Sequence, residues 1–223
     1  MTKNQSDFAK KIEYALLRPE ATAADVDTVC SQAVRLGCYG VVVNPVHIKL
    51  ATWLLKNEKP LPICTVSYPT GATLPRVKAF EAKEAVKLGA REISMVLDLA
   101  AFLADDHKTV TQSIQGVITA TKGEVPVKVV VEAGLLSPEQ VVSAGKLCVE
   151  AGAKYVVTSS GYGRERVMVS QVRQLRKAVG PDVGIIACGG IRGYKDAMAM
   201  IEAGADRIGS SAAPAILGVS TAS

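Results

Sequence analysis

Short runs of apolar residues alternate with longer amphipathic segments along nearly the whole chain. The short runs are rich in Val and Ile, which is typical of strands buried on both faces of a parallel sheet. We therefore expect eight strands, at residues 12–17, 40–43, 63–66, 92–97, 127–131, 155–157, 183–187 and 207–208.

The segments between these runs carry apolar residues at helical spacing, and several begin with a capping residue. Thr22 and Ser137 each start a predicted helix, and a third helix carries Val77, Phe80 and Leu88. The expected helices cover residues 3–9, 22–37, 50–55, 73–89, 108–121, 166–179, 194–203 and 212–217, with one more after Ser137.

A short repeat supports this alternation. Leu88-Gly89-Ala90, Ala151-Gly152-Ala153 and Ala203-Gly204-Ala205 each end a predicted helix and precede a strand. Their separations are each about two units of ~30 residues, the size of one strand-helix unit. The pattern predicts a single (β/α)8 TIM barrel, one domain spanning 1–223. The alternative, an open doubly wound sheet, calls for a glycine-rich fingerprint after the first strand, and residues 17–19 are nothing like one.

Charge and hydropathy narrow the possible partners. The net charge is +5, and the Lys and Arg residues are scattered, which argues against a nucleic-acid arm or a polybasic membrane patch and slightly favours small anionic ligands. No apolar run reaches the ~18 residues of a membrane span, and the first residues lack the apolar core of a signal peptide. We expect a cytoplasmic protein without nucleic-acid or membrane partners.

Metal and thiol chemistry have little support in the sequence. The five cysteines form no CxxC pair, and buried, reduced thiols are expected. Only His47 and His107 are present, without the spacing of metal ligands, so no metal site is expected. A Ser-His-Asp triad has no nucleophile elbow to support it.

Three small-residue loops follow the last three predicted strands. Such loops present backbone N–H groups and hydroxyls without bulk, as an anion at a strand end requires. Because the carboxyl ends of barrel strands meet at one mouth, the loops predict one phosphate site. The alternative is that they are merely tight turns. The candidate phosphate-binding residues are Thr158, Ser159, Ser160, Gly161, Gly189, Gly190, Gly209, Ser210 and Ser211.

A set of motifs follows in order from Ile12 to Leu217: IEYALLRPEAT, VNPVHIKLA, CTVSYPTGAT, VKAFEAKEAV, VKVVVEAGLLSPEQ, TSSGY, ACGGIR and DAMAMIEAGADRIGSSAA. This succession resembles the deoxyribose-phosphate aldolases, Schiff-base-forming (β/α)8 enzymes that need no metal or organic cofactor. The resemblance implies a sugar phosphate held by the three loops. It also implies a homo-oligomer, since members of that family are commonly dimers or larger.

The residues that carry the family's reaction differ here. The Schiff-base lysine of the family falls on Val157, its second lysine on Ile186, and its strand-four aspartate on Ser94. An imine nucleophile must be an amine, and the following proton transfer needs a carboxylate within reach. The resemblance therefore implies a member without Schiff-base aldolase activity.

A relocated lysine would restore that activity. Lys128 lies early in its predicted strand, away from the loops, Lys154 has outward parity, and Lys49 lies on a helix as a surface lysine does. A retained Schiff-base aldolase, a carbon–carbon lyase, stays an alternative hypothesis.

Asp98, Glu132 and Cys188 are placed near the mouth by strand parity or strand ends, and offer a different chemistry of proton transfer or thiol addition. Each has a structural alternative: Asp98 as a helix cap, Glu132 as the ion-pair partner of Lys128 or an arginine, and Cys188 as a small buried residue. The leading hypothesis is a non-catalytic binding or regulatory member that holds a phosphorylated small molecule, as a homo-oligomer or together with an active homologue.

Overall fold

The computed structural model describes residues 3–163 and 165–219. Eight parallel strands pair in chain order and close on themselves, β1 with β8, so the predicted (β/α)8 barrel is confirmed. The strands are β1 (Ile12–Leu16), β2 (Gly40–Val43), β3 (Leu61–Val66), β4 (Glu92–Val96), β5 (Val127–Val130), β6 (Tyr155–Val157), β7 (Gly184–Cys188) and β8 (Arg207–Ser210).

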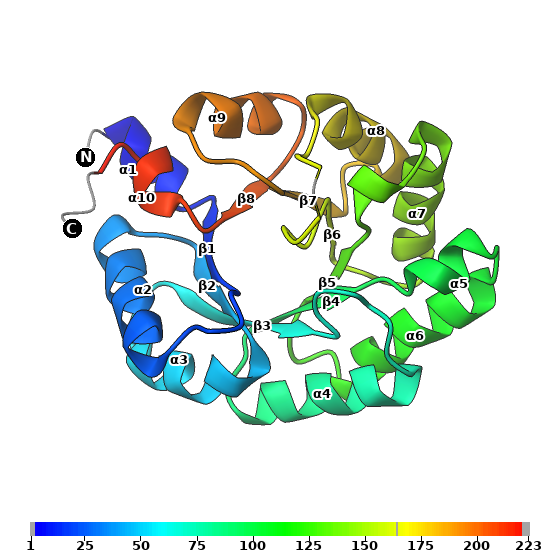
Figure 1. Ribbon diagram of the computed structural model, residues 1–223, viewed down its shortest axis with the longest axis horizontal. Helices are drawn as coiled ribbons and strands as arrows, with labels where there is room; N and C mark the ends of the chain where they lie inside the picture. The colour runs from blue at the N-terminus through cyan, green and yellow to red at the C-terminus, as the bar shows by residue number, and fades with distance from the viewer. Residues whose placement is uncertain (1–2, 164, 220–223) are drawn as a thin grey trace.

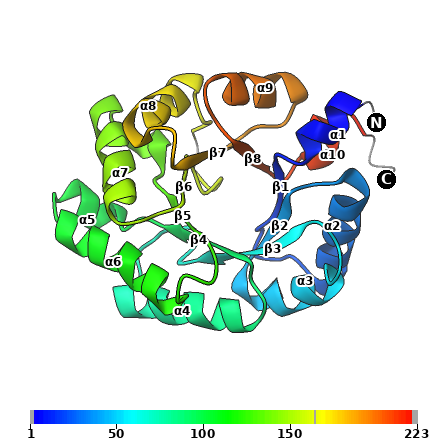
Figure 2. The ribbon, with the colours of Figure 1, turned by 180° about the vertical axis from the view of Figure 1, so that it is seen from behind.

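The helices form a ring around the barrel (Figures 1 and 2). They are α1 (Lys3–Ala9), α2 (Ala23–Leu36), α3 (Ile48–Leu54), α4 (Pro75–Lys87), α5 (Leu99–Leu103), α6 (His107–Ala120), α7 (Pro138–Glu150), α8 (Val169–Val179), α9 (Tyr194–Glu202) and α10 (Ala213–Ile216), with 3-10 turns η1 (Pro45–His47) and η2 (Ala133–Leu135). Helices α1 and α10, near the two ends of the chain, lie side by side in both views. None of the helices in the described ranges is long and apolar enough to cross a membrane.

Local capping explains where several helices start. Thr22 accepts a hydrogen bond from the Asp25 amide, while the Asp25 carboxylate accepts one from the Thr22 amide, which completes a capping box. Ser137 and Gln140 form the same arrangement before α7. Both caps were predicted from the sequence and are confirmed.

Some predicted boundaries are wrong. Helix α4 begins at Pro75 rather than residue 73, and α8 begins at Val169 rather than 166. The short helix α5 was not predicted; Asp98 caps it, and only seven residues separate that cap from Asp106, the cap of α6. Strands β7 and β8 extend further than expected, so Cys188 and Ser210 belong to strands.

Helix α4 buries a lysine instead of its apolar stripe. Val77, Phe80 and Leu88 are exposed, whereas Lys78 is fully buried and its Nζ donates a hydrogen bond to the Val96 carbonyl, 3.2 Å away. That carbonyl ends β4, so the buried amine serves a backbone acceptor at the carboxyl end of the barrel. Burial lowers the pKa of Lys78, and the charge of the nearby Asp98 opposes that shift.

Ionised side chains fill the barrel at the amino ends of its strands. Lys128 Nζ lies 2.7 Å from a Glu13 oxygen and 2.9 Å from a Glu92 oxygen. Arg207 contacts the same two carboxylates at 2.8 and 3.0 Å. Burial alone would raise the pKa of Glu92, but the charges of Lys128 and Arg207 outweigh it and hold that pKa below its usual value. Lys128 thus lies away from the mouth, as its position in the strand predicted.

Candidate ligand site at the barrel mouth

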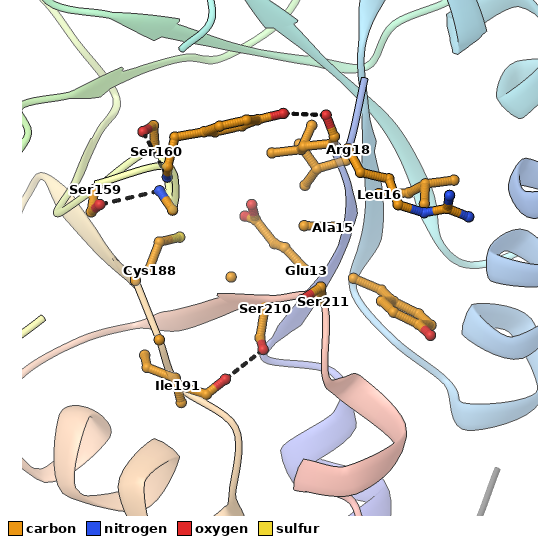
Figure 3. Close-up of a pocket in the computed structure, with 18 of the residues that line it drawn as sticks. Glu13, Ala15, Leu16, Arg18, Ser159, Ser160, Cys188, Ile191, Ser210 and Ser211 are labelled. Atoms are coloured by element: carbon orange, nitrogen blue, oxygen red, sulfur yellow. Dashed lines mark hydrogen bonds between the residues drawn. The ribbon is translucent and has the colours of Figure 1, made fainter. Parts of the chain in front are cut away.

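A cavity of about 800 Å³ opens at the carboxyl ends of the strands. Its walls come from the start of the chain around Glu13 to Pro19 and from the loops after β6, β7 and β8 (Figure 3). In the close-up, the Glu13 and Cys188 side chains point toward the centre of the cavity, between Ser159–Ser160 on one side and Ser210–Ser211 on the other.

The two residues on which the resemblance places the family's lysines belong to a small apolar cluster inside the barrel. Val157 and Ile186 are direct neighbours in the register of β6 and β7, and both pack with Val96 and Val130. Val157 is 3% exposed and lines the cavity, whereas Ile186 is 0% exposed. The floor of the cavity therefore presents hydrocarbon at Val157, and Ile186 is buried beside it.

The third family position, Ser94, also lines the cavity and is hydrogen-bonded to Tyr68. Tyr68 follows β3 and packs against the apolar cluster. Burial raises the pKa of the Tyr68 phenol, as do the nearby Cys188 and Glu132, and the bond to Ser94 only partly offsets them. A neutral phenol and a serine hydroxyl thus lie side by side at the position where the resemblance places the family's aspartate.

The loop after β6 uses many of its polar groups to hold its own shape. The Glu132 carboxylate accepts hydrogen bonds from the Ser160 amide and from the Ser159 hydroxyl, the latter at 3.4 Å. Ser159 Oγ also accepts from the Gly161 amide at 3.1 Å, and Ser160 Oγ accepts from the Tyr162 amide at 3.2 Å. An anion here would meet donors that a carboxylate already occupies.

Thr158 directly follows β6, before this loop, and does not line the cavity. It is fully buried, donating through Oγ to the Cys188 carbonyl at 2.7 Å and accepting from the Cys188 amide at 2.8 Å. Its role in the structure is to tie β6 to β7.

The loop after β7 is built from two glycines with left-handed backbone, Gly189 at φ 112° and Gly190 at φ 72°. A Cβ on Gly190 would press on the Arg166 side chain, and that guanidinium donates two hydrogen bonds to the Gly190 carbonyl, at 3.1 and 2.6 Å. Arg166 also pairs with Asp196 at 3.2 Å. The arginine therefore fixes the loop while standing at the rim of the cavity.

At the loop after β8, the Ser210 hydroxyl is already hydrogen-bonded within the protein, whereas the Ser211 hydroxyl faces solvent. Ser210 Oγ donates to the Ile191 carbonyl at 2.6 Å and accepts from the Ala212 amide at 3.0 Å. Ser211 is exposed, and its hydroxyl has no partner among the described residues. Gly209 lies so close to Cys188 that a Cβ there would overlap the sulfur.

Arg192 is the cation best placed to meet a ligand. It lines the cavity two residues after Gly190, is exposed, and has no ion pair within residues 3–163 and 165–219. Arg18, at the opposite wall, is paired with Asp25 and lies 3.5 Å from Glu20. The Tyr162 hydroxyl bridges the two walls by donating to the Leu17 carbonyl.

The acid and thiol candidates have structural contacts. Asp98 does not line the cavity, and its carboxylate accepts from the Ala101 amide at 3.2 Å, so it caps α5. Glu132 pairs with the β6 loop rather than with Lys128 or an arginine. Burial, helped by the charge of Glu13, raises the pKa of Cys188 to about 12, so the thiol is protonated near neutral pH.

No lysine lines the cavity within the described part of the chain. Lys49 and Lys154 are exposed on the outside of the barrel, as predicted, and Lys128 is bound by two carboxylates. Across the same residues, no three His, Cys, Asp or Glu side chains are grouped to hold a metal ion.

The sequence analysis missed five residues that shape this end of the barrel. Arg192 stands in the quoted ACGGIR motif, and its place after a glycine pair is the signal that was available. Tyr68 and Tyr162 follow small-residue stretches after strands, where a side chain can turn over the mouth. Glu13 and Lys78 gave no such signal, because their burial depends on partners far away in the sequence.

Comparison with known proteins identifies relatives along the whole chain. The sequence is 41% identical over 216 residues to a deoxyribose-phosphate aldolase of Enterococcus faecalis, covering 96% of this chain and 98% of the relative. It is 42% identical over 208 residues to a deoxyribose-phosphate aldolase of Thermococcus gammatolerans, covering 92% of each. A family model for dihydroorotate dehydrogenase matches residues 104–221, the half of the barrel that carries the three loops.

Solved structures agree with the sequence relatives. A structure described as QR15, an aldolase, superposes with a TM-score of 0.91 at 34% identity and covers 95% of both chains. The deoxyribose phosphate aldolase of Aeropyrum pernix, described as a unique tetrameric structure, superposes with a TM-score of 0.90 at 29% identity, covering 96% of this chain and 91% of that one.

Proposed function

We propose, from the premise that this chain belongs to the deoxyribose-phosphate aldolase family, that it binds a phosphorylated small molecule at the mouth of its barrel without forming a Schiff base. Membership of the family supports a function like that of the aldolases. The residues at the barrel mouth support binding of a phosphorylated ligand without a Schiff base. One observation supports this proposal above the others. The cavity is lined by loops suited to an anion, whereas its floor has the apolar side chain of Val157.

The anion end of the site is best supported at the loops after β7 and β8. Gly189 and Gly190 leave room for close approach, and Arg192 and Ser211 offer a guanidinium and a hydroxyl that have no partner among the described residues. A planar guanidinium suits the bidentate recognition of phosphate oxygens. The β6 loop, whose donors face Glu132, then acts mainly as a wall.

The part of the cavity that would hold the carbonyl group of a sugar phosphate lacks the residues needed for imine formation. Imine formation joins an amine to a carbonyl carbon and expels water, and the amine must be neutral when it attacks. Val157 and Ile186 supply no nitrogen, and the Nζ of Lys128 is held between the Glu13 and Glu92 carboxylates. A bound aldehyde would meet Val157, Cys188 and the Ser94 hydroxyl, none of which forms a stable imine.

A ligand-binding barrel without the covalent step fits a binding or regulatory role. The predicted homo-oligomer, a possible pairing with an active homologue and the cytoplasmic location belong to this proposal. The tetrameric state named for the Aeropyrum pernix relative supports assembly of several copies.

Two measurements on the purified chain test the proposal. Calorimetric titration with inorganic phosphate and with deoxyribose 5-phosphate should show saturable binding. Borohydride reduction with deoxyribose 5-phosphate, followed by intact mass measurement, should show no adduct. Arg192→Ala should weaken binding roughly 10- to 100-fold, the loss of one charge-assisted contact, whereas Lys154→Ala, on the outer surface, should leave it unchanged.

The outcomes separate the hypotheses. A mass adduct that survives reduction shows that a lysine outside the family's positions forms the imine, and the chain is then a working aldolase. Equal affinity in the wild type and in Arg192→Ala places the anion elsewhere. Absence of binding to either ligand removes the phosphate site altogether.

A further inference from the structure

Glu13 brings a carboxylate to the bottom of the ligand cavity. Its side chain lines the cavity, is 3% exposed and points toward the centre (Figure 3). The strand register leaves room for it, because Glu13 lies opposite Gly40 on β2 and opposite Gly209 on β8. Ala15, two residues further along β1 and on the same side, lines the cavity with only a methyl group. A ligand that enters from the mouth can therefore reach the carboxylate.

The Glu13 carboxylate is anchored by the ion cluster at the amino ends of the strands. Its Oε2 accepts a hydrogen bond from Lys128 Nζ at 2.7 Å, and its Oε1 accepts one from the Arg207 guanidinium at 2.8 Å. A carboxylate oxygen offers about two lone-pair positions, so each oxygen of Glu13 can accept from one further donor. The cavity is the side from which a ligand can supply that donor.

The other polar groups on this part of the cavity wall are hydroxyls and a thiol. Tyr68, Ser94 and Cys188 line the cavity, and Tyr68 is hydrogen-bonded to Ser94. Burial raises the pKa of the Cys188 thiol and of the Tyr68 phenol, and the charge of Glu13 adds to both shifts. These groups therefore keep their protons near neutral pH, and the two hydroxyls can both donate and accept hydrogen bonds.

This arrangement suits an alcohol better than a carbonyl group. A hydroxyl can donate to the Glu13 carboxylate and at the same time accept from a hydroxyl such as that of Ser94. A carbonyl oxygen only accepts, so beside Glu13 it would face another acceptor and lose the hydrogen bonds that it makes in water. An alkyl chain would likewise remove water from the carboxylate without replacing its hydrogen bonds. The inner end of the ligand should therefore carry hydroxyl groups.

The same wall of the cavity leads from Glu13 to the loop that supports the phosphate. Gly209 is the register partner of Glu13, and Ser211 follows it by two residues. At ~3.3 Å per residue along a strand, Ser211 lies about 7 Å closer to the mouth than Gly209. A short carbon chain can therefore join a phosphate at the loop to hydroxyl groups at Glu13.

We infer that the ligand is the phosphate ester of a polyol, and that Glu13, Tyr68 and Ser94 bind its alcohol groups at the bottom of the cavity. This inference rests on the proposed function, because it needs the phosphate end of the same cavity. It adds the chemical class of the ligand, a reduced molecule in place of a carbonyl compound. A polyol offers no carbon that an amine could attack, which agrees with the apolar side chain of Val157 on the cavity floor.

Calorimetric titration of the full chain with ribitol 5-phosphate and pentyl phosphate tests the inference. The two compounds share the carbon chain and the phosphate and differ in their hydroxyl groups. Ribitol 5-phosphate should bind roughly 10-fold or more tightly, the effect of one hydrogen bond to a charged group. 2-Deoxyribitol 5-phosphate, with an alcohol in place of the aldehyde, should bind more tightly than deoxyribose 5-phosphate. Inorganic phosphate measures the anion end alone.

Two pairs of variants assign the preference to residues. Glu13→Gln should lower the preference for ribitol 5-phosphate over pentyl phosphate roughly 10-fold, and Tyr68→Phe about 3- to 10-fold, while both keep the affinity for inorganic phosphate. Glu92→Gln is the control for Glu13→Gln, because Glu92 pairs with the same two cations but does not line the cavity. Tyr194→Phe, at an exposed position on α9, is the control for Tyr68→Phe. Tyr68→Phe decides the matter if Glu13→Gln does not fold.

The outcomes separate this inference from the proposed function. Equal affinities for ribitol 5-phosphate and pentyl phosphate, with inorganic phosphate still bound, overturn the polyol assignment alone. A preference that Glu13→Gln and Tyr68→Phe leave unchanged also overturns it, as does tighter binding of deoxyribose 5-phosphate than of its alcohol. If none of the phosphate compounds binds, the proposed function fails and the polyol assignment fails with it.

Discussion

Replacing Lys128 by methionine is expected to destabilise the barrel strongly. The Lys128 side chain is 1% exposed and neutralises part of the charge of Glu13 and Glu92. Methionine preserves the length of the side chain, so the change removes a charge and leaves little cavity. Two carboxylates then share the single cation of Arg207, and one buried negative charge is left uncompensated.

The magnitude follows from the burial of the pair. Removing one partner of a buried ion pair costs about 3–5 kcal/mol, because the remaining charge keeps its desolvation penalty. For a chain of 223 residues, that corresponds to a fall of roughly 6–20 °C in Tm, at ~2–4 °C per kcal/mol. Urea unfolding followed by circular dichroism measures it, with Lys154→Met as control, expected within about 0.5 kcal/mol of the wild type.

The pH dependence gives a second readout. In the wild type, the pKa of Glu92 lies below its usual value, so its contribution to stability is present above about pH 4.3 and is lost as the pH falls through the folded value. In Lys128→Met, that carboxylate takes up a proton at a higher pH. The difference in the free energy of unfolding between the wild type and Lys128→Met should therefore be largest at pH 7 and should narrow toward pH 4. A cost below about 1 kcal/mol at pH 7, or a gap that widens in acid, would refute the reasoning.

Three further predictions concern single residues. Asp98→Ala removes the cap of α5 and should cost about 1 kcal/mol in urea unfolding, and no change there would mean that the cap is not needed. Cys188, with its pKa raised to about 12, should react with a disulfide reagent at pH 8 far more slowly than the thiols of the unfolded chain; equal rates would contradict the burial. Gly71→Ala should cost more than about 2 kcal/mol, because its φ is 67° and a Cβ would overlap the Leu97 carbonyl. Gly123→Ala, at φ 68° with open space, is its control and should cost only about 1 kcal/mol; equal costs would show that the overlap relaxes.

The architecture was accessible from the sequence because it depends on local signals. The strands that face apolar surroundings on both sides read as runs of Val and Ile, and Thr22 and Ser137 start helices through hydrogen bonds within three residues. The repeat of Gly-Ala junctions then set the number of units. The missed element, α5, is five residues long, and no periodicity can mark so short a helix.

The details of the site were not accessible, because they depend on contacts between distant segments. A hydroxyl-rich loop looks the same in sequence whether it faces a ligand or, as Ser159 and Ser160 do, a carboxylate from another strand. The sequence alone suggests that Lys78 is a surface lysine of an amphipathic helix, because its hydrogen-bond acceptor, the Val96 carbonyl of β4, is distant in the chain. The same misreading hides the outward stripe of α4, since periodicity shows that a helix has two sides but not which one faces the barrel.

The hydrocarbon layer inside the barrel bears on how readily such a chain can change its chemistry. An amine introduced at Val157 would enter a largely apolar setting with Val130 and Ile186 as neighbours. Burial there favours the uncharged form of an amine, which is the form that attacks a carbonyl. The surroundings of position 157 therefore favour the reactive form of an amine, so that Val157→Lys would place a nucleophile where the barrel already lowers the pKa of a lysine.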